Sequence, residues 1–316
     1  MSKTENGLAF IFPGQGSQSL GMMRGLAEIH TEVVQTFRTA SDVLGYDLWN
    51  VVNEGPVERL NLTEHTQPAM LAAGVAAFRV WLKHTEKMPE LMAGHSLGEY
   101  SALVCAGAFD FGDAVGLVAE RAKLMQGAVE AGTGAMAAIL GLDDAKVVEV
   151  CAMVSIADDL VTPANFNSPG QIVIAGHAAA VNRAIEALKA EGAKRSVLLP
   201  VSVPSHCPLM GEAALKFRET LDKIPVHSIK IPVVHNVDVS SHSTAEAIRS
   251  ALEMQLSSPV RWTDTIQFLF NQGVRRFIEC GPGKVLTGLN KRIVVDVKSE
   301  AVFDPDSLNK ALELLK

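Results

Sequence analysis

Two short apolar segments run directly into glycine-rich turns, and this feature constrains the fold more than any other. Leu8–Phe12 is uniformly apolar and stops at residues 13–16, Pro-Gly-Gln-Gly. Leu91–Ala93 runs into residues 94–98, Gly-His-Ser-Leu-Gly, and an apolar, helix-like segment follows at 101–108. A short apolar run that ends in glycine is typical of a buried parallel strand. The repeated order of strand, turn and helix predicts an α/β fold built on a parallel sheet.

A second pattern occupies residues 131–200. Helix-like segments at 143–154 and 178–190 are interleaved with strand-like segments, which lie at 134–141, 160–166, 171–175 and 195–199. The order β-α-β-β-α-β is that of a ferredoxin-like unit. We therefore predict a small ferredoxin-like subdomain over 131–200, inserted into a larger α/β subdomain made of residues 1–130 and 201–316.

Further elements of the large subdomain are expected on both sides of the insert. The segment 66–85 is helix-like, with Thr66 as its N-cap and Pro68 in its first turn. Beyond the insert, 231–239 and 274–280 are expected to form strands, with a helix near 244–254 and another near 260–272.

Composition excludes several classes of protein. With 48% hydrophobic residues the 316-residue chain can bury a core, and its net charge of −7 argues against a nucleic-acid-binding protein. The four cysteines form no Cys-x-x-Cys or Cys/His cluster, so a zinc site is not expected. No uncharged apolar stretch approaches the roughly 18 residues of a membrane span, and Leu8–Phe12 is too short for a signal peptide. We expect a cytoplasmic protein that does not bind membranes.

Residues 94–98 match the G-x-S-x-G pattern of a nucleophile elbow, with Ser96 at its centre. Such a serine occupies a strained turn between strand and helix, and the flanking glycines let the backbone pass closely. Its hydroxyl lies at a helix N-terminus, where N–H groups can stabilise an oxyanion. The alternative is an ordinary glycine-rich turn. The earlier loop at 14–18 is a poor match to a dinucleotide site, but it could supply a second oxyanion N–H.

A serine nucleophile needs a base, and His206 is the best candidate among nine histidines. It lies between Pro204 and Pro208, which stiffen the segment and could direct the side chain. The alternative is a structural or exposed histidine. His95 is adjacent to Ser96, but side chains of neighbouring residues project in different directions, so it is a weaker candidate.

Arg121 is the most informative charged residue. In the predicted helix 113–130 it falls in the same stripe as Ala114, Val118 and Met125. An arginine on a buried face needs a partner, because burying an unpaired charge costs several kcal/mol, on the order of 3–5. One alternative is a structural salt bridge. The other is a guanidinium that binds the carboxylate of a substrate.

Taken together, these residues resemble the malonyl-CoA:acyl carrier protein transacylases of type II fatty acid synthesis and the related acyltransferase domains of polyketide synthases. The resemblance spans nearly the whole chain and rests on ordered motifs at 12–17, 94–99, 119–121, 165–174, 205–206, 255–262 and 281–283. It implies an α/β-hydrolase-like core with a ferredoxin-like insert.

The resemblance also implies a role for each residue of the site. Ser96 would be the nucleophile and His206 its base, with the main-chain carbonyl of Gln255 orienting the histidine. Arg121 would hold the malonyl carboxylate. The backbone N–H groups of two further residues, Gln15 and Leu97, would form the oxyanion hole.

The implied reaction is a ping-pong transfer of malonyl from malonyl-CoA to the phosphopantetheine thiol of acyl carrier protein, with no metal or tightly bound cofactor. Related polyketide domains often carry phenylalanine at the position of Ser205 for malonyl and serine for methylmalonyl. Discrete malonyl transferases also carry serine there, so the resemblance still implies malonyl, with the strictness of the selection left open. Two other functions remain possible on sequence alone. One is a serine esterase or thioesterase on the same elbow, and the other is a non-catalytic module that binds CoA or carrier protein.

Overall fold

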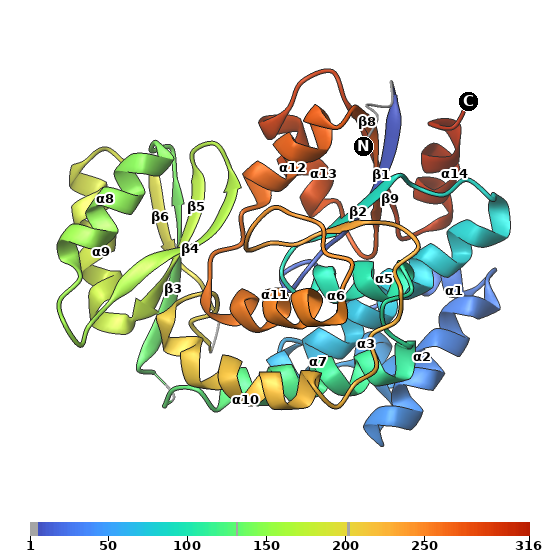
Figure 1. Cartoon of the computed structure of the whole chain (residues 1–316), viewed down its shortest axis with the longest axis horizontal. Helices are drawn as coiled ribbons and strands as arrows, with labels where there is room; N and C mark the ends of the chain where they lie inside the picture. Colours follow the sequence, from blue (N-terminus) through green and yellow to red (C-terminus); the bar gives the residue numbers. More distant parts are fainter. Residues whose placement is uncertain (1–5, 131, 201–202) are drawn as a thin grey trace.

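A computed structural model of the chain describes residues 6–130, 132–200 and 203–316. It has a large part built on a five-stranded sheet and a small part built on a four-stranded sheet. In Figure 1 the small part lies at the left and the large part at the right.

The large sheet is entirely parallel, with strand order β7-β2-β1-β8-β9. Its strands are β1 Gly7–Phe12, β2 Leu91–Gly94, β7 Val233–Val234, β8 Val274–Cys280 and β9 Lys298–Val302. In β1, Leu8, Phe10 and Phe12 enter one hydrophobic core, whereas Ala9 and Ile11 enter another. Alternate residues of a strand point to opposite faces, so this central strand is buried on both sides.

Helices cover both faces of this sheet (Figure 1). The larger core takes side chains from α1 Arg24–Ala27, α2 Thr31–Leu44, α3 Leu48–Glu54, α4 Val57–Leu60, α5 Thr63–His84, α6 Gly98–Cys105, α7 Phe111–Gln126, α10 Gly211–Leu221, α11 Ala245–Ser257 and α14 Pro305–Glu313. The other core takes them from α12 Trp262–Asn271 and α13 Val285–Ile293. A short 3₁₀ helix, η1, spans Pro208–Met210.

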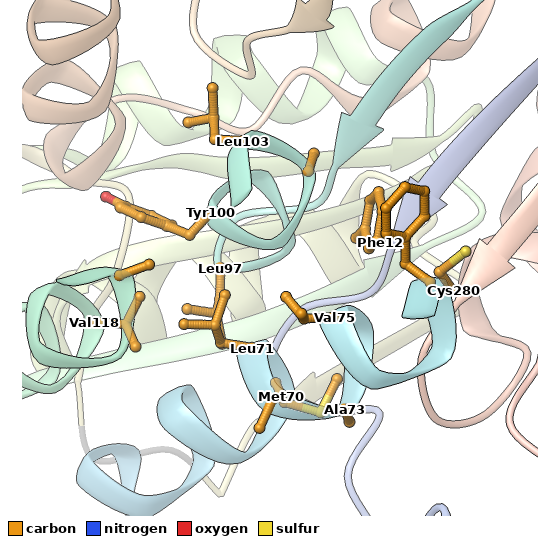
Figure 2. Packing of buried hydrophobic residues seen from close by; sticks show 14 of the residues in the cluster. Phe12, Met70, Leu71, Ala73, Val75, Leu97, Tyr100, Leu103, Val118 and Cys280 are labelled. Atoms are coloured by element: carbon orange, nitrogen blue, oxygen red, sulfur yellow. The ribbon is translucent and has the colours of Figure 1, made fainter. Parts of the chain in front are cut away.

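Helix α6 is packed among its neighbours in the larger core. Figure 2 shows Leu97 and Tyr100 directed toward Leu71 of α5 and Val118 of α7. Tyr100 and Leu97 are 0% and 1% exposed. The residues that follow Ser96 are therefore held by apolar contacts with two long helices.

The small sheet is antiparallel, with order β4-β5-β3-β6. Its elements run β3 Gly134–Leu140, α8 Asp144–Val154, β4 Val161–Ser168, β5 Gln171–His177, α9 Ala178–Ala190 and β6 Arg195–Leu198. This βαββαβ order confirms the predicted fold class, a parallel α/β core with a ferredoxin-like unit. The two subdomain boundaries stay a prediction, since residues 131 and 201 lie outside the described residues.

Two local predictions are wrong. Only Val233–Val234 of the segment 231–239 is a strand, because the chain then turns toward β2 and buries His235 and Asn236 beside it. Helix α5 begins at Thr63, so Thr66 is not its N-cap. The Thr66 hydroxyl instead donates to the carbonyl oxygen of Leu60 at 2.6 Å.

None of the helices within the described ranges is long and apolar enough to cross a membrane.

Candidate active site

The backbone around Ser96 has the geometry of a tight elbow. Ser96 lies between β2 and α6 with φ of 51°, a left-handed conformation that costs energy for any residue with a side chain. A Cβ on Gly94 would lie 1.9 Å from the carbonyl carbon of Gly98, and a Cβ on Gly98 would lie 2.0 Å from the carbonyl oxygen of Phe12. Both contacts are impossible, so the turn requires glycine at the two positions of the motif.

The side chain of Asn236 fixes the backbone of this elbow through two hydrogen bonds. Its side-chain oxygen accepts the N–H of Ser96 at 2.7 Å, and its side-chain nitrogen donates to the carbonyl of Gly94 at 2.6 Å. Asn236 is 1% exposed. These hydrogen bonds favour the strained conformation of Ser96, because breaking them would leave buried polar groups unpaired.

Ser96 and His206 meet, as the sequence predicts. The Ser96 hydroxyl lies 2.7 Å from Nε2 of His206, and Nδ1 of His206 lies 2.8 Å from the main-chain oxygen of Gln255. A carbonyl oxygen can only accept, so Nδ1 carries the hydrogen and Nε2 is left to accept the hydroxyl proton. Burial, and next the positive charge of Arg121, lower the pKa of His206 to about 3. The imidazole is therefore neutral near pH 7 and can act as a base.

Arg121 lies in the predicted buried stripe of α7, together with Ala114, Val118 and Met125. It is 1% exposed. Its Nη1 donates to the side-chain oxygen of Gln67 at 2.8 Å. Its Nη2 donates to the side-chain oxygen of Gln255 at 3.0 Å and lies 3.4 Å from the Ser96 hydroxyl.

The salt-bridge alternative for Arg121 fails. In the part of the chain that the structure describes, Arg121 forms no ion pair with a carboxylate, and all three of its hydrogen-bond acceptors are neutral oxygens. Its buried Nε has no partner among the described residues either. A buried cation without an anion is costly to maintain, and it attracts a carboxylate strongly.

A cavity between the two parts of the molecule brings the predicted residues together. Its walls include Gln15, Leu97, Ser96, Arg121 and His206 from the large part and Met136, Asn165 and Leu199 from the small part and the segment after it. The backbone N–H groups of Gln15 and Leu97 make no hydrogen bond with any other described residue. They are thus available to a ligand in the cavity.

Several residues of the site escaped sequence analysis. Gln67 and Asn236 sit in segments with no recognisable motif, and Glu99 appeared only as the last residue of the elbow motif. His235, to which the sequence assigns no role, is 0% exposed and contacts Glu99. His95 turns away from Ser96 and pairs with Asn167 at 2.8 Å. Gln67 follows four polar residues, Thr63 to Thr66, so the sequence gives no signal that it is buried beside Arg121.

The described residues contain no cluster of three or more His, Cys, Asp or Glu side chains that could bind a metal ion.

Comparison with known proteins agrees with this geometry. Residues 9–303 match the family model of the acyl transferase domain. The malonyl CoA-acyl carrier protein transacylase of Escherichia coli O157:H7 is 55% identical over 97% of this chain and 99% of its own length. The Bacillus subtilis protein of the same name is 44% identical over 98% and 97% of the two chains.

Solved structures show the same relationship. The transacylase of Coxiella burnetii superposes with a TM-score of 0.96 at 48% identity, covering 100% of this chain and 99% of its own. A malonyl-transacylase solved in complex with a type II PKS acyl-carrier protein has a TM-score of 0.95 at 56% identity, covering 98% and 99%. The chain therefore belongs to the acyl transferase family and, within it, to the malonyl CoA-acyl carrier protein transacylases.

Proposed function

We propose that the protein transfers the malonyl group of malonyl-CoA to the phosphopantetheine thiol of acyl carrier protein, through a malonyl ester on Ser96. One observation carries this proposal. The guanidinium of Arg121 is buried next to the nucleophile, 3.4 Å from its hydroxyl, and its hydrogen-bond acceptors among the described residues are all neutral oxygens. Such a group favours an acyl chain that ends in a carboxylate.

In the first half-reaction the Ser96 oxygen attacks the thioester carbonyl while Nε2 of His206 takes its proton. The main-chain oxygen of Gln255 supports the imidazolium that forms, through the Nδ1 hydrogen bond. The N–H groups of Gln15 and Leu97 stabilise the tetrahedral oxyanion. The carbon–sulfur bond then breaks, and His206 returns the proton to the sulfur of CoA.

The second half-reaction reverses these steps with a different thiol. His206 takes the proton of the phosphopantetheine thiol, the sulfur attacks the Ser96 ester, and the proton returns to the serine oxygen. Arg121 keeps the carboxylate in place throughout, so that the reacting carbonyl stays aligned with the oxyanion donors. No residue in this scheme needs a metal or a bound cofactor. Ser205 also lines the cavity.

The geometry favours transfer over simple hydrolysis. In a serine esterase a carboxylate usually contacts the catalytic histidine, whereas here a neutral carbonyl does so. An esterase for uncharged acyl groups would also have no use for a buried arginine beside the nucleophile. A module that only binds CoA would not need the 2.7 Å contact between Ser96 and His206.

We also place this activity in the cytoplasm. The four cysteines are all unpaired, as is usual where thiols are kept reduced.

Intact-protein mass spectrometry tests the proposal. After mixing with malonyl-CoA, the wild-type protein should gain the mass of one malonyl group and lose it again when holo acyl carrier protein is added. Ser96→Ala should gain nothing. Loss of the adduct to water at the same rate without carrier protein would instead indicate a thioesterase, and no adduct at any donor concentration would indicate a binding module.

A further inference from the structure

Glu99 is a buried carboxylate that lies next to the site but does not line the cavity. It is 0% exposed and is the second residue of α6. One of its oxygens lies 2.7 Å from Nδ1 of His235. The other accepts the N–H of Asn236 at 2.9 Å and the side-chain amide of Gln255 at 2.9 Å. An ionised carboxylate can accept all of these hydrogen bonds, because both of its oxygens are acceptors.

The amide of Gln255 connects this carboxylate to the cavity, and its orientation is unambiguous. Its nitrogen donates to Glu99 and, at 3.0 Å, to the main-chain oxygen of Ser96, both of which can only accept. Its oxygen accepts from Arg121, which can only donate. The same residue also supplies the main-chain oxygen that holds His206. Gln255 therefore joins the base, the nucleophile and the arginine.

We propose that Glu99 is a positioning residue of the transfer reaction, which acts on His206 and Arg121 through the side chain of Gln255. The inference rests on the proposed function. The carboxylate fixes the Gln255 amide, and the amide in turn fixes the main-chain oxygen for His206 and the side-chain oxygen for Arg121. A negative charge thus belongs to the site, but it lies behind a neutral amide instead of directly on the histidine.

This placement has a chemical advantage for an enzyme that must bind a carboxylate. A carboxylate in direct contact with Arg121 would form an ion pair and occupy the donors that the substrate needs. With the amide in between, Glu99 offsets the buried positive charge from a distance. When a carboxylate enters, it can replace the neutral oxygen of Gln255 at Arg121, because a carboxylate is the stronger hydrogen-bond acceptor.

A double-mutant cycle tests the proposal. The variants are Glu99→Gln, which keeps the shape and removes the charge, Gln255→Met, which keeps the main-chain oxygen and removes the amide, and the combination of the two. We measure kcat/KM for acylation of Ser96 with malonyl-CoA and with acetyl-CoA, normalised to the amount of protein that can be acylated.

Each single variant should lower kcat/KM for malonyl-CoA on the order of 10- to 100-fold, because small displacements of catalytic groups have effects of this size. The loss with acetyl-CoA should be smaller, since only the malonyl group needs Arg121. The double variant should be no slower than Gln255→Met alone, because Glu99 acts through that side chain. Losses that multiply, or Glu99→Gln with wild-type rates, would overturn the inference.

Glu279→Gln is the matched control. Glu279 is also 0% exposed and accepts two backbone N–H groups, those of Leu286 and Thr287, but it does not line the cavity. It should keep near wild-type kinetics, which shows that removing a buried carboxylate is not enough to slow the reaction.

The design also distinguishes two other outcomes, which are failure of Glu99→Gln to fold and failure of the proposed function. If Glu99→Gln does not fold, a second measurement tests the inference. It is the NMR signal of the Nδ1–H proton of His206, which is assigned by its absence in His206→Ala. It should shift or broaden in Gln255→Met, and an unchanged signal would overturn the inference. If the wild-type protein forms no malonyl adduct at all, the proposed function fails, independently of any result on Glu99.

Discussion

Two arginines of this protein illustrate opposite uses of the same side chain. Arg218 of α10 has 24% of its side-chain surface exposed and binds three carboxylates, those of Glu246 at 2.7 Å, Asp222 at 2.8 Å and Glu253 at 3.2 Å. Hydrogen bonds to Glu246 and then Asp222 raise its pKa above the usual value. Arg121 of α7 is buried, yet within the described ranges its acceptors are all neutral oxygens, from Gln67, Gln255 and Ser96.

The difference shows which of the two belongs to a binding site. Around Arg218 the charges are already balanced, and exposed ion pairs of this kind contribute little to stability, about 0–1 kcal/mol each. Around Arg121 no carboxylate of the described residues contacts the guanidinium, and its acceptors are neutral oxygens that a carboxylate ligand can replace, so such a ligand gains a strong interaction. The acceptors around each guanidinium, which are carboxylates for Arg218 and neutral oxygens for Arg121, distinguish the two cases.

Removing Arg121 should have the largest effect. Arg121→Ala is expected to lower kcat/KM for malonyl transfer by about 100- to 1,000-fold, because losing one partner of a buried charge pair costs about 2–5 kcal/mol. Steady-state transfer from malonyl-CoA to acyl carrier protein measures this. Transfer of acetyl should be far less affected, and equal losses for both donors would show that Arg121 serves the fold and not the carboxylate.

Giving Arg121 a carboxylate should have the next largest effect. Gln67→Glu would place a negative charge 2.8 Å from Nη1, which makes the surroundings of Arg121 resemble those of Arg218. We expect KM for malonyl-CoA to rise on the order of 10- to 100-fold, since the new ion pair competes with the substrate. Gln67→Met is the control without a charge. If Glu and Met at this position behave alike, neutral partners are not what keeps Arg121 available.

The pH dependence should change next. The pKa of His206 is lowered to about 3 by burial and then by Arg121. Arg121→Met removes the second cause and leaves the first, so the pKa should rise while staying below its usual value of about 6.5. The acid limb of kcat/KM for acetyl-CoA, the uncharged donor, should therefore move to higher pH in the variant. An acid limb that stays in place or moves to lower pH would contradict the electrostatic coupling.

The smallest effect is expected at the surface. Arg218→Met should lower the free energy of unfolding by no more than about 3 kcal/mol, since each of its three ion pairs contributes up to about 1 kcal/mol, and by less in high salt, because accessible charges are screened. Urea unfolding at low and high ionic strength measures this. Malonyl transfer should stay at the wild-type rate, and a clear loss of transfer would mean that the two arginines are not as separate as their contacts indicate.

Sequence patterns predicted those features that depend on local order. The stripe of α7 placed Arg121 on a buried face, and the elbow motif gave Ser96, because periodicity and turn sterics act over a few residues. The order of strands and helices in the small part was sufficient for its fold.

Features that depend on long-range contacts were not predictable in this way. Asn236 accepts the N–H of Ser96 from 140 positions along the chain, and Gln67 meets Arg121 from 54 positions away. Neither residue carries a local signal of these partners. The short length of β7 has the same cause. After Val234 the chain leaves the strand, and His235 and Asn236 contact Glu99.

A crystal structure of the protein malonylated on Ser96 tests the central claim most directly. We predict that the carboxylate lies about 2.7–2.9 Å from the terminal nitrogens of Arg121, in place of at least one of the amide oxygens of Gln67 and Gln255. A carboxylate directed to solvent, with Arg121 still bound to both amides as in the free protein, would contradict the claim that this buried charge is kept for the substrate.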